Sequence, residues 1–141
     1  MQARTHKDLI AWKKAVALAS RVYQATAGFP NPERHPLAGQ MRRAALSVPS
    51  NIAEGAGRGS RAEYLRFLNI ARGSLAELET QIYIAIDLGL LATGQQLAEE
   101  TTEVARLLSA LVRRLREYRE RAASFVPAAH RPKAAAPSTN S

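Results

Sequence analysis

The chain has 141 residues, a length typical of one domain. It contains no cysteine, which excludes disulfides, thiolate nucleophiles and thiolate zinc sites, and no apolar run approaches the ~20 residues that span a bilayer. Its 20 Lys and Arg residues against 12 Asp and Glu residues give a formal net charge of +8, which favours polyanions such as nucleic acid. The opening MQARTHKDLI lacks the apolar stretch of a signal peptide, so we expect a cytoplasmic protein without membrane contact.

The first helix is predicted to begin near Asp8, which can cap it or lie in its first turn, and to end at Gly28. Apolar residues recur along it at spacings of three and four, which predicts one core-facing stripe. The stripe consists of Leu9, Trp12, Val16, Ala19, Tyr23 and Thr26. The following GFPNPERHP holds three prolines and a glycine and is predicted to be a connection rather than a helix.

The second helix is predicted to begin at Pro36, which is acceptable in a first turn, and to end at the glycines at positions 55, 57 and 59. Its core-facing residues are Leu37, Met41, Ala44 or Ala45, Val48 and Ile52.

Pro49 lies inside this helix and has no N–H for the carbonyl four residues earlier, which predicts a kink. Ser47, Ser50 and Asn51 can bond the freed backbone groups. Asn51 and Glu54 also resemble a capping box that restarts the helix beyond the kink. A bent helix wrapped on the core is the favoured interpretation, and a binding role for Asn51, Glu54 and the glycines is the alternative.

The third and fourth helices have the clearest signals. Ser60 and Glu63 form a capping-box pattern, and a strict stripe then runs to Gly89 through Leu68, Ala71, Leu75, Leu78, Ile82 and Ala85. Thr93 and Gln96 form a second capping-box pattern at the start of the fourth helix, which Pro127 ends. Its stripe consists of Leu97, Thr101, Val104, Leu108, Leu111, Leu115, Tyr118, Ala122 and Phe125.

Four striped helices with short connections predict an all-α fold, an antiparallel up-down-up-down four-helix bundle over residues 1–126 with a kinked second helix. Residues 127–141 are a low-complexity tail that we expect to be disordered. Helices three and four carry a second apolar set, namely Leu65, Phe67, Ile70, Ile84, Ile86, Leu107 and Val112. Either these helices are the most buried ones or this set packs on another subunit, and we favour a homo-oligomer.

Several segments together resemble a known family: DLIAWKKA at 8–15, VYQAT and FP within 22–30, QMRRAALSVPSNIAEGAGR at 40–58 and EYLRFLNIARGSLAELETQ at 63–81. Over roughly residues 8–91 the chain resembles the four-helix-bundle proteins encoded in intervening sequences of bacterial 23S rRNA genes. The resemblance implies a ring of bundles, typically a homopentamer, without an established enzymatic activity. More distantly, the chain resembles the accessory bundle proteins of diversity-generating retroelements, which are basic and bind nucleic acid and a reverse transcriptase.

The expected topology gathers basic residues at one end of the bundle, where the first helix starts, helices two and three connect and the fourth helix ends. The candidate nucleic-acid-binding residues there are Lys13, Lys14, Arg58, Arg61, Arg66, Arg113, Arg114, Arg116, Arg119 and Arg121. The opposite end gathers acids, among them Glu77, Glu99, Glu100 and Glu103. The helix dipole explains this pattern in the fourth helix but not in the third, whose first turns hold Arg61 and Arg66.

We therefore expect phosphate contacts to nucleic acid, with RNA favoured over DNA, that tolerate sequence and weaken with salt. Base recognition is not expected, because most aromatic residues, Tyr118 included, lie on apolar stripes where core packing accounts for them. The alternative is a protein-interaction scaffold, for example a partner of a reverse transcriptase, without a nucleic-acid role.

No catalytic, metal or cofactor site is expected. Di-metal bundles need Glu-x-x-His pairs, and none of His6, His35 and His130 has a glutamate three residues before it. The GAGRG segment links two helices rather than a strand and a helix, so it is predicted to be a helix end and turn rather than a phosphate loop. A non-enzymatic accessory protein is expected.

Overall fold

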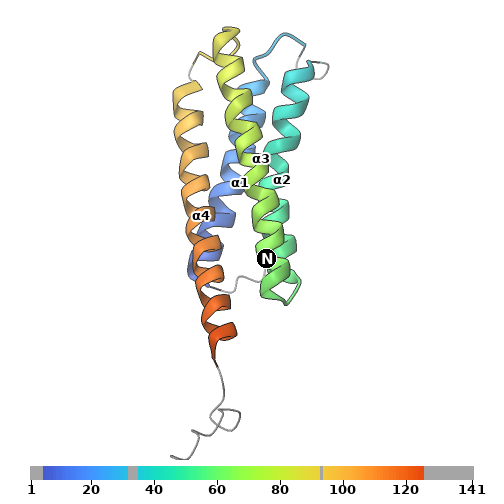
Figure 1. Cartoon of the computed structure of the whole chain (residues 1–141). Helices are drawn as coiled ribbons and strands as arrows, with labels where there is room; N and C mark the ends of the chain where they lie inside the picture. The colour runs from blue at the N-terminus through green and yellow to red at the C-terminus, as the bar shows by residue number, and fades with distance from the viewer. Residues whose placement is uncertain (1–4, 32–34, 93, 126–141) are drawn as a thin grey trace, which may run out of the picture.

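The computed structural model describes residues 5–31, 35–92 and 94–125, and these form four antiparallel helices (Figure 1). The helices are α1 (His6–Thr26), α2 (Pro36–Gly57), α3 (Arg61–Asp87) and α4 (Gly94–Ser124). Each helix packs against two others, α1 on α2 and α4, and α3 on α2 and α4, which closes the bundle. The predicted all-α four-helix bundle is confirmed. The expected tail at 127–141 and the expected cap Thr93 lie outside the described residues.

Capping side chains fix the N-termini of three helices. Thr5 is the N-cap of α1 and its hydroxyl accepts a hydrogen bond from the Asp8 N–H at 3.2 Å, so Asp8 lies in the first turn. Ser60 caps α3 and accepts from the Glu63 N–H at 3.1 Å, as predicted. His35 caps α2, where its Nδ1 accepts from the Leu37 N–H at 3.2 Å. None of the helices in the described part of the chain has an apolar stretch long enough to cross a membrane.

The predicted stripes of α2, α3 and the first half of α4 lie in the core, as expected. The buried members are Met41, Ala44, Ala45, Val48 and Ile52 on α2, Leu68, Ala71, Leu75, Leu78, Ile82 and Ala85 on α3, and Leu97, Thr101, Val104, Leu108 and Leu111 on α4. The stripe of α4 then continues past the core, because this helix extends beyond the ends of its neighbours (Figure 1). Tyr118 is 52% exposed and Phe125 72% exposed, so the prediction that Tyr118 packs in the core is wrong.

The predicted stripe of α1 is partly right. Ala19 and Thr26 are buried and Trp12 packs against the core, but Val16 and Tyr23 are 38% and 40% exposed. The rest of the buried face is displaced by about one residue from the prediction and carries Asp8, Ala11, Ala15, Leu18 and Val22. Alanines allow the backbone of α1 to lie close to its neighbours, so the face with the smallest side chains turns inward while larger apolar side chains lie at its margins.

Asp8 is a buried carboxylate that ties α1 to α3. Its side chain is 3% exposed; Oδ2 accepts a hydrogen bond from the Thr5 hydroxyl at 2.9 Å and Oδ1 accepts one from the Tyr64 hydroxyl at 3.1 Å. Tyr64 is fully buried on α3. A buried carboxylate is costly without such donors, so this contact sets how the starts of α1 and α3 lie against each other.

Helix α2 continues through Pro49, which is itself buried. The Asn51 side chain reaches back one turn, and its Nδ2 donates to the Ser47 carbonyl at 2.7 Å and to the Ser47 hydroxyl at 2.9 Å. The Ser47 hydroxyl in turn lies 2.8 Å from the Ser74 hydroxyl on α3. Asn51 therefore bonds the carbonyl of Ser47 rather than that of Ala45, which is the one that Pro49 has no N–H to reach. The predicted restart by a capping box with Glu54 is wrong, because the helix is unbroken.

The second apolar set divides between core and surface. Leu65, Phe67 and Val112 are buried within the bundle, so part of the set needs no second subunit. Ile70, Ile84 and Ile86 remain 37–44% exposed on α3.

Gly55 marks the closest approach of α2 to α3. A Cβ at this position would lie 2.8 Å from the Phe67 Cβ and 3.1 Å from the Tyr64 Cδ1. We expect Gly55→Ala to lower the free energy of unfolding by about 1–3 kcal/mol, because the two helices must move apart. Urea denaturation followed by circular dichroism measures this change.

Gly73→Ala is the matched control, since nothing lies within 4 Å of a Cβ placed at this exposed position of α3. Here alanine should raise the free energy of unfolding by about 0.5–1 kcal/mol through helix propensity. Equal effects of the two substitutions would contradict the close packing at Gly55.

Tyr64→Phe removes the hydroxyl that donates to Asp8 and keeps the buried ring. We expect it to lower the free energy of unfolding by about 1–3 kcal/mol, because the carboxylate stays buried with one donor fewer. Tyr83→Phe, at a 55% exposed position, should change stability by no more than about 0.5 kcal/mol. Thermal denaturation of both variants tests the contact, and matching melting curves would argue against it.

Candidate nucleic-acid interface

Three chain segments meet at one end of the bundle: the start of α1, the connection between α2 and α3, and the last turns of α4 (Figure 1). This end is called the basic end below. Contacts across it confirm the topology, since Asp8 of α1 bonds Tyr64 of α3, and Arg61 of α3 lies against Tyr118 of α4. Most of the predicted binding residues lie here, in three different environments.

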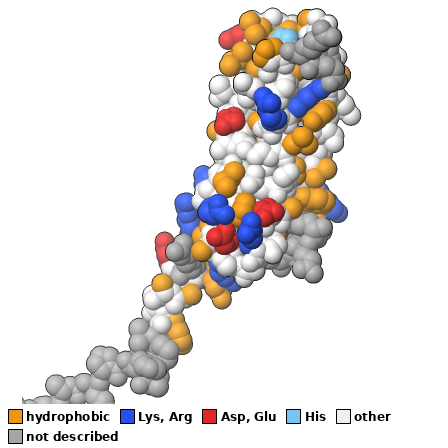
Figure 2. Space-filling model, turned by 90° about the vertical axis from the view of Figure 1, so that its right-hand side faces the viewer, with side chains coloured by type: hydrophobic (Ala, Val, Ile, Leu, Met, Phe, Trp, Pro, Cys, Tyr) orange, Lys and Arg blue, Asp and Glu red, His pale blue; other side chains and the backbone are white. Residues whose placement is uncertain are grey.

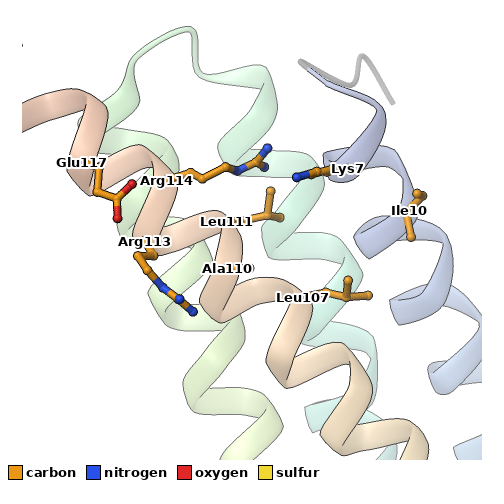
Figure 3. Close-up of a pocket in the computed structure, with 8 residues that line it drawn as sticks. All are labelled: Lys7, Ile10, Leu107, Ala110, Leu111, Arg113, Arg114 and Glu117. Atoms are coloured by element: carbon orange, nitrogen blue, oxygen red, sulfur yellow. The ribbon is translucent and has the colours of Figure 1, made fainter.

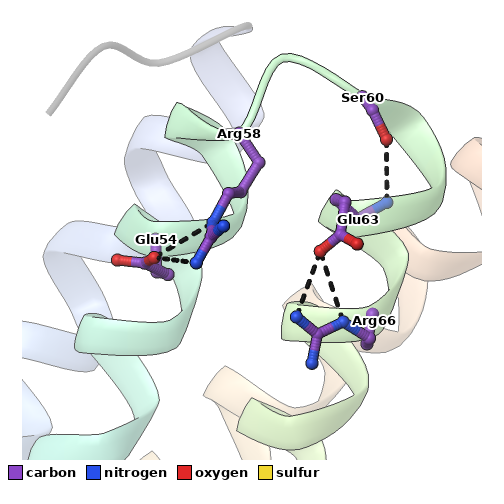
Figure 4. A network of polar contacts seen from close by, with 5 residues as sticks. All are labelled: Glu54, Arg58, Ser60, Glu63 and Arg66. Carbon is purple, nitrogen blue, oxygen red and sulfur yellow. Dashed lines mark hydrogen bonds and ion pairs between the residues drawn. The ribbon is translucent and has the colours of Figure 1, made fainter.

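Arg58 and Arg66 lie near the α2–α3 connection and are paired with acids of their own helices (Figure 4). Arg58 donates to Glu54 Oε1 through Nε at 3.0 Å and Nη2 at 2.7 Å, and Arg66 donates to Glu63 Oε2 at 3.2 and 3.1 Å. Both guanidinium groups also lie over the ring of Phe67, at 5.2 and 4.4 Å from its centroid. Glu63 thus binds Arg66 here, and the charges of both arginines are largely balanced locally.

Acidic and basic side chains also alternate in the lower half of the face drawn in Figure 2, so the described residues form no continuous basic surface there. The arginines that lack such local partners belong to α4 and to the first residue of α3.

Lys13 and Lys14 do not lie with the rest of the predicted set. They are about 9 Å further along α1 than Lys7, given the 1.5 Å rise per residue. Lys14 binds Glu103 of α4 at 2.6 Å, although these residues were expected at opposite ends of the bundle. Lys14 and Glu103 both lie partway along their helices. Assigning every charge to one of two ends of the bundle was therefore wrong for this pair.

Arg113 and Arg114 border an apolar groove between α1 and α4 (Figure 3). The groove has a volume of about 500 Å³, an apolar floor of Ile10, Leu107, Ala110 and Leu111, and a polar rim of Lys7, Arg113, Arg114 and Glu117. Figure 3 shows Arg114 and Lys7 reaching toward each other across the groove, while Arg113 and Glu117 project from another side of α4. Two cations that converge from different helices create a positive potential suited to an anion.

Arg61, Arg114 and Arg121 line a second hollow of about 410 Å³, beside the first. It is enclosed by the starts of α1 and α3 and by the last turns of α4, and Thr5, Asp8, Tyr64, Leu115, Glu117 and Tyr118 complete its lining. The guanidinium carbon of Arg61 lies 3.3 Å from the centroid of the Tyr118 ring. This contact holds Arg61 against α4 although Arg61 is the first residue of α3, where the helix dipole disfavours a cation.

Arg116 lies on a third side of α4, where it lines a shallow polar hollow with Arg72 and Arg113 and with Glu117 and Glu120. Within the described part of the chain, Arg61, Arg113, Arg114, Arg116 and Arg121 form no ion pair within 4 Å. The side chain of Arg119 lies outside the part that the structure describes.

Lys7, Asp8 and Tyr64 lie at this end but are not among the residues predicted to bind nucleic acid. An antiparallel alignment of the start of α1 with the end of α4 would have placed Lys7 beside the arginines of α4. The buried hydroxyl–carboxylate contact gives no sequence signal, because an Asp at a helix start is ordinarily a solvated first-turn residue. No group of three or more His, Cys, Asp or Glu side chains able to hold a metal ion occurs among the described residues.

Comparison with known proteins places this bundle in a family. The sequence profile described as "23S rRNA-intervening sequence protein" matches residues 7–110, which include α1, α2, α3 and half of α4. A search of curated proteins finds no match.

A crystal structure of a protein of unknown function from the S23 ribosomal protein family of Bacteroides thetaiotaomicron VPI-5482 has a similar fold. It superposes with a TM-score of 0.71 at 24% identity, over 76% of this chain and 98% of that one. Neither description names an enzymatic activity. From the profile match over most of the bundle, the chain belongs to the 23S rRNA-intervening sequence protein family.

Proposed function

We propose that this protein is a non-enzymatic, cytoplasmic accessory factor that binds nucleic acid, RNA in preference, through phosphate contacts at its basic end. One observation carries the proposal: six cations at this end, on three helices and around three hollows, form no ion pair among the described residues, namely Lys7, Arg61, Arg113, Arg114, Arg116 and Arg121. Unpaired guanidinium groups on the rims of hollows are available to phosphate oxygens.

Two further observations support an RNA ligand and a repeated subunit. The family and the similar crystal structure carry names that refer to 23S rRNA and to a ribosomal protein. Exposed Ile70 and Ile84 lie two heptads apart on α3, a spacing typical of a helix face that packs on a partner. We propose a homopentameric ring, as the family resemblance implies, which would repeat the basic end in each subunit.

The binding proposal predicts a strong dependence on salt. If about four guanidinium groups contact phosphates, the affinity for a labelled single-stranded RNA should fall about 50-fold between about 50 and 200 mM salt. Replacing Arg113, Arg114 and Arg116 with Gln should reduce the slope of log affinity against log salt by about 2. Fluorescence anisotropy measures both quantities.

The matched control replaces Arg21, Arg43 and Arg106 with Gln, which removes the same net charge away from the last turns of α4. This variant should retain most of the affinity and most of the salt slope. The charges that it removes do not contact the RNA and act only through the long-range electrostatic potential of the protein, which salt screens. Equal losses in the two variants, or no binding of wild-type protein at low salt, would overturn the proposal.

The alternative is a protein-interaction scaffold, for example for a reverse transcriptase. It is favoured by the exposed apolar side chains near the end of α3, where Tyr83, Ile84 and Leu88 are 55%, 44% and 64% exposed. A scaffold would keep its protein partner in the Arg113, Arg114 and Arg116 variant, whereas a nucleic-acid-binding protein would lose its ligand.

The ring itself is tested by light scattering of the full chain at micromolar concentration. We expect a mass several times the 15.4 kDa of one chain. A mass of one chain would contradict the assembly and leave the phosphate contacts to be judged by the salt titration.

A further inference from the structure

Tyr118 continues the predicted apolar stripe of α4, yet it lies where this helix extends past the core and is 52% exposed. Phe125, further along the same stripe, is 72% exposed, and single exposed apolar side chains are common on protein surfaces. What distinguishes Tyr118 is therefore not its exposure but the residues that surround it.

The ring of Tyr118 is also held in place. Arg61 contacts it from α3, with the guanidinium carbon 3.3 Å from the ring centroid, while half of the Tyr118 surface remains open to solvent. An aromatic side chain fixed by an arginine loses little conformational freedom when a ligand stacks on it.

The hollow beside Tyr118 supplies charges that complement a nucleotide. Arg61, Arg114 and Arg121 line it, and none of them forms an ion pair among the described residues. Of its two carboxylates, Asp8 is buried and accepts hydrogen bonds from two hydroxyls, and Glu117 lies on the rim with Arg114. A flat aromatic surface beside several guanidinium groups is the combination that binds a base and its neighbouring phosphates.

We propose that this hollow binds an unpaired nucleotide of a single strand, with its base stacked on Tyr118 and its phosphates on Arg114 and Arg121. This inference rests on the proposed nucleic-acid function and makes it more specific. In a duplex the faces of the bases are covered by their neighbours, so only an unpaired or terminal base can stack on the ring. The protein should therefore prefer single strands to duplexes, although duplexes carry more phosphate charge.

The test compares a labelled single-stranded RNA of about 15 nucleotides with a duplex of the same sequence at fixed low salt, by anisotropy. Wild-type protein should bind the single strand more tightly than the duplex. Tyr118→Leu should weaken single-strand binding about 10-fold, because stacking on one base is lost, with little change in duplex affinity or in the salt slope. Tyr118→Phe should retain the single-strand affinity, since the ring remains.

Tyr23→Leu is the matched control, because Tyr23 is 40% exposed on α1 outside this hollow and also has an arginine, Arg42, over its ring. It should leave both affinities unchanged, and circular dichroism should confirm that all three variants keep the helical content of the wild type. A free mononucleotide added in excess should compete only weakly, because it lacks the additional phosphates of the strand.

Three negative outcomes have different meanings. If the duplex and the single strand bind equally well and Tyr118→Leu behaves like Tyr23→Leu, the stacking site is refuted and phosphate binding stands. If neither nucleic acid binds even at low salt, the proposed function fails and this inference fails with it. Strong binding of the free mononucleotide would refute the single strand as ligand and point to a nucleotide site.

Discussion

The buried contact between Asp8 and Tyr64 is the constraint on which the basic end of the bundle depends. A carboxylate that is 3% exposed is stable only where donors reach it, and its donors come from Thr5 and from α3. The starts of α1 and α3 therefore cannot slide independently. Because α4 packs across both helices in antiparallel direction, its last turns must lie over this contact, and the arginines of α4 gather there.

The cations of this end are stabilised in different ways. Arg58 and Arg66 each form an ion pair with a glutamate about one turn away on the same helix. These pairs balance the charges of both arginines locally. Arg121 lies in the last turn of α4, where the helix dipole favours a cation without occupying its donor groups, whereas Arg113, Arg114 and Arg116 lie about two turns or more before the end of this helix, beyond the reach of this effect. Arg61 is disfavoured by the dipole of α3 and is held by the ring of Tyr118 instead. Stability and ligand binding therefore compete at Arg58 and Arg66 but not along α4.

A single bundle with a few unpaired guanidinium groups would bind a phosphate backbone weakly at physiological salt. A ring would change this, since each bound subunit raises the effective concentration of the strand near the next one. The hollow at Tyr118 lies at the start of α3, whereas the exposed Tyr83, Ile84 and Leu88 lie at the other end of this helix. Assembly through the end of α3 would leave the hollow open, so the proposed ring and the proposed stacking site are compatible.

The sequence by itself determined the four helices and the buried faces of α2 and α3. It also determined the N-cap of α3 at Ser60 and the glycine-rich connections between helices. These features depend on residues close in sequence and on large apolar side chains at regular spacing, which a linear pattern records. Tertiary packing decided which face of α1 is buried. The alanines of this helix let its backbone lie close to the neighbouring helices, so they are buried while Val16 and Tyr23 are partly exposed.

The candidate site was likewise only partly contained in the sequence. Charge and topology predicted which end would be basic. They did not predict that Lys14 would pair with Glu103, or that Arg58 and Arg66 would pair with glutamates of their own helices. They also did not predict that Tyr118 would lie outside the core. Ion pairs and aromatic contacts depend on distances of a few ångströms between helices, and such distances exist only once the bundle has closed.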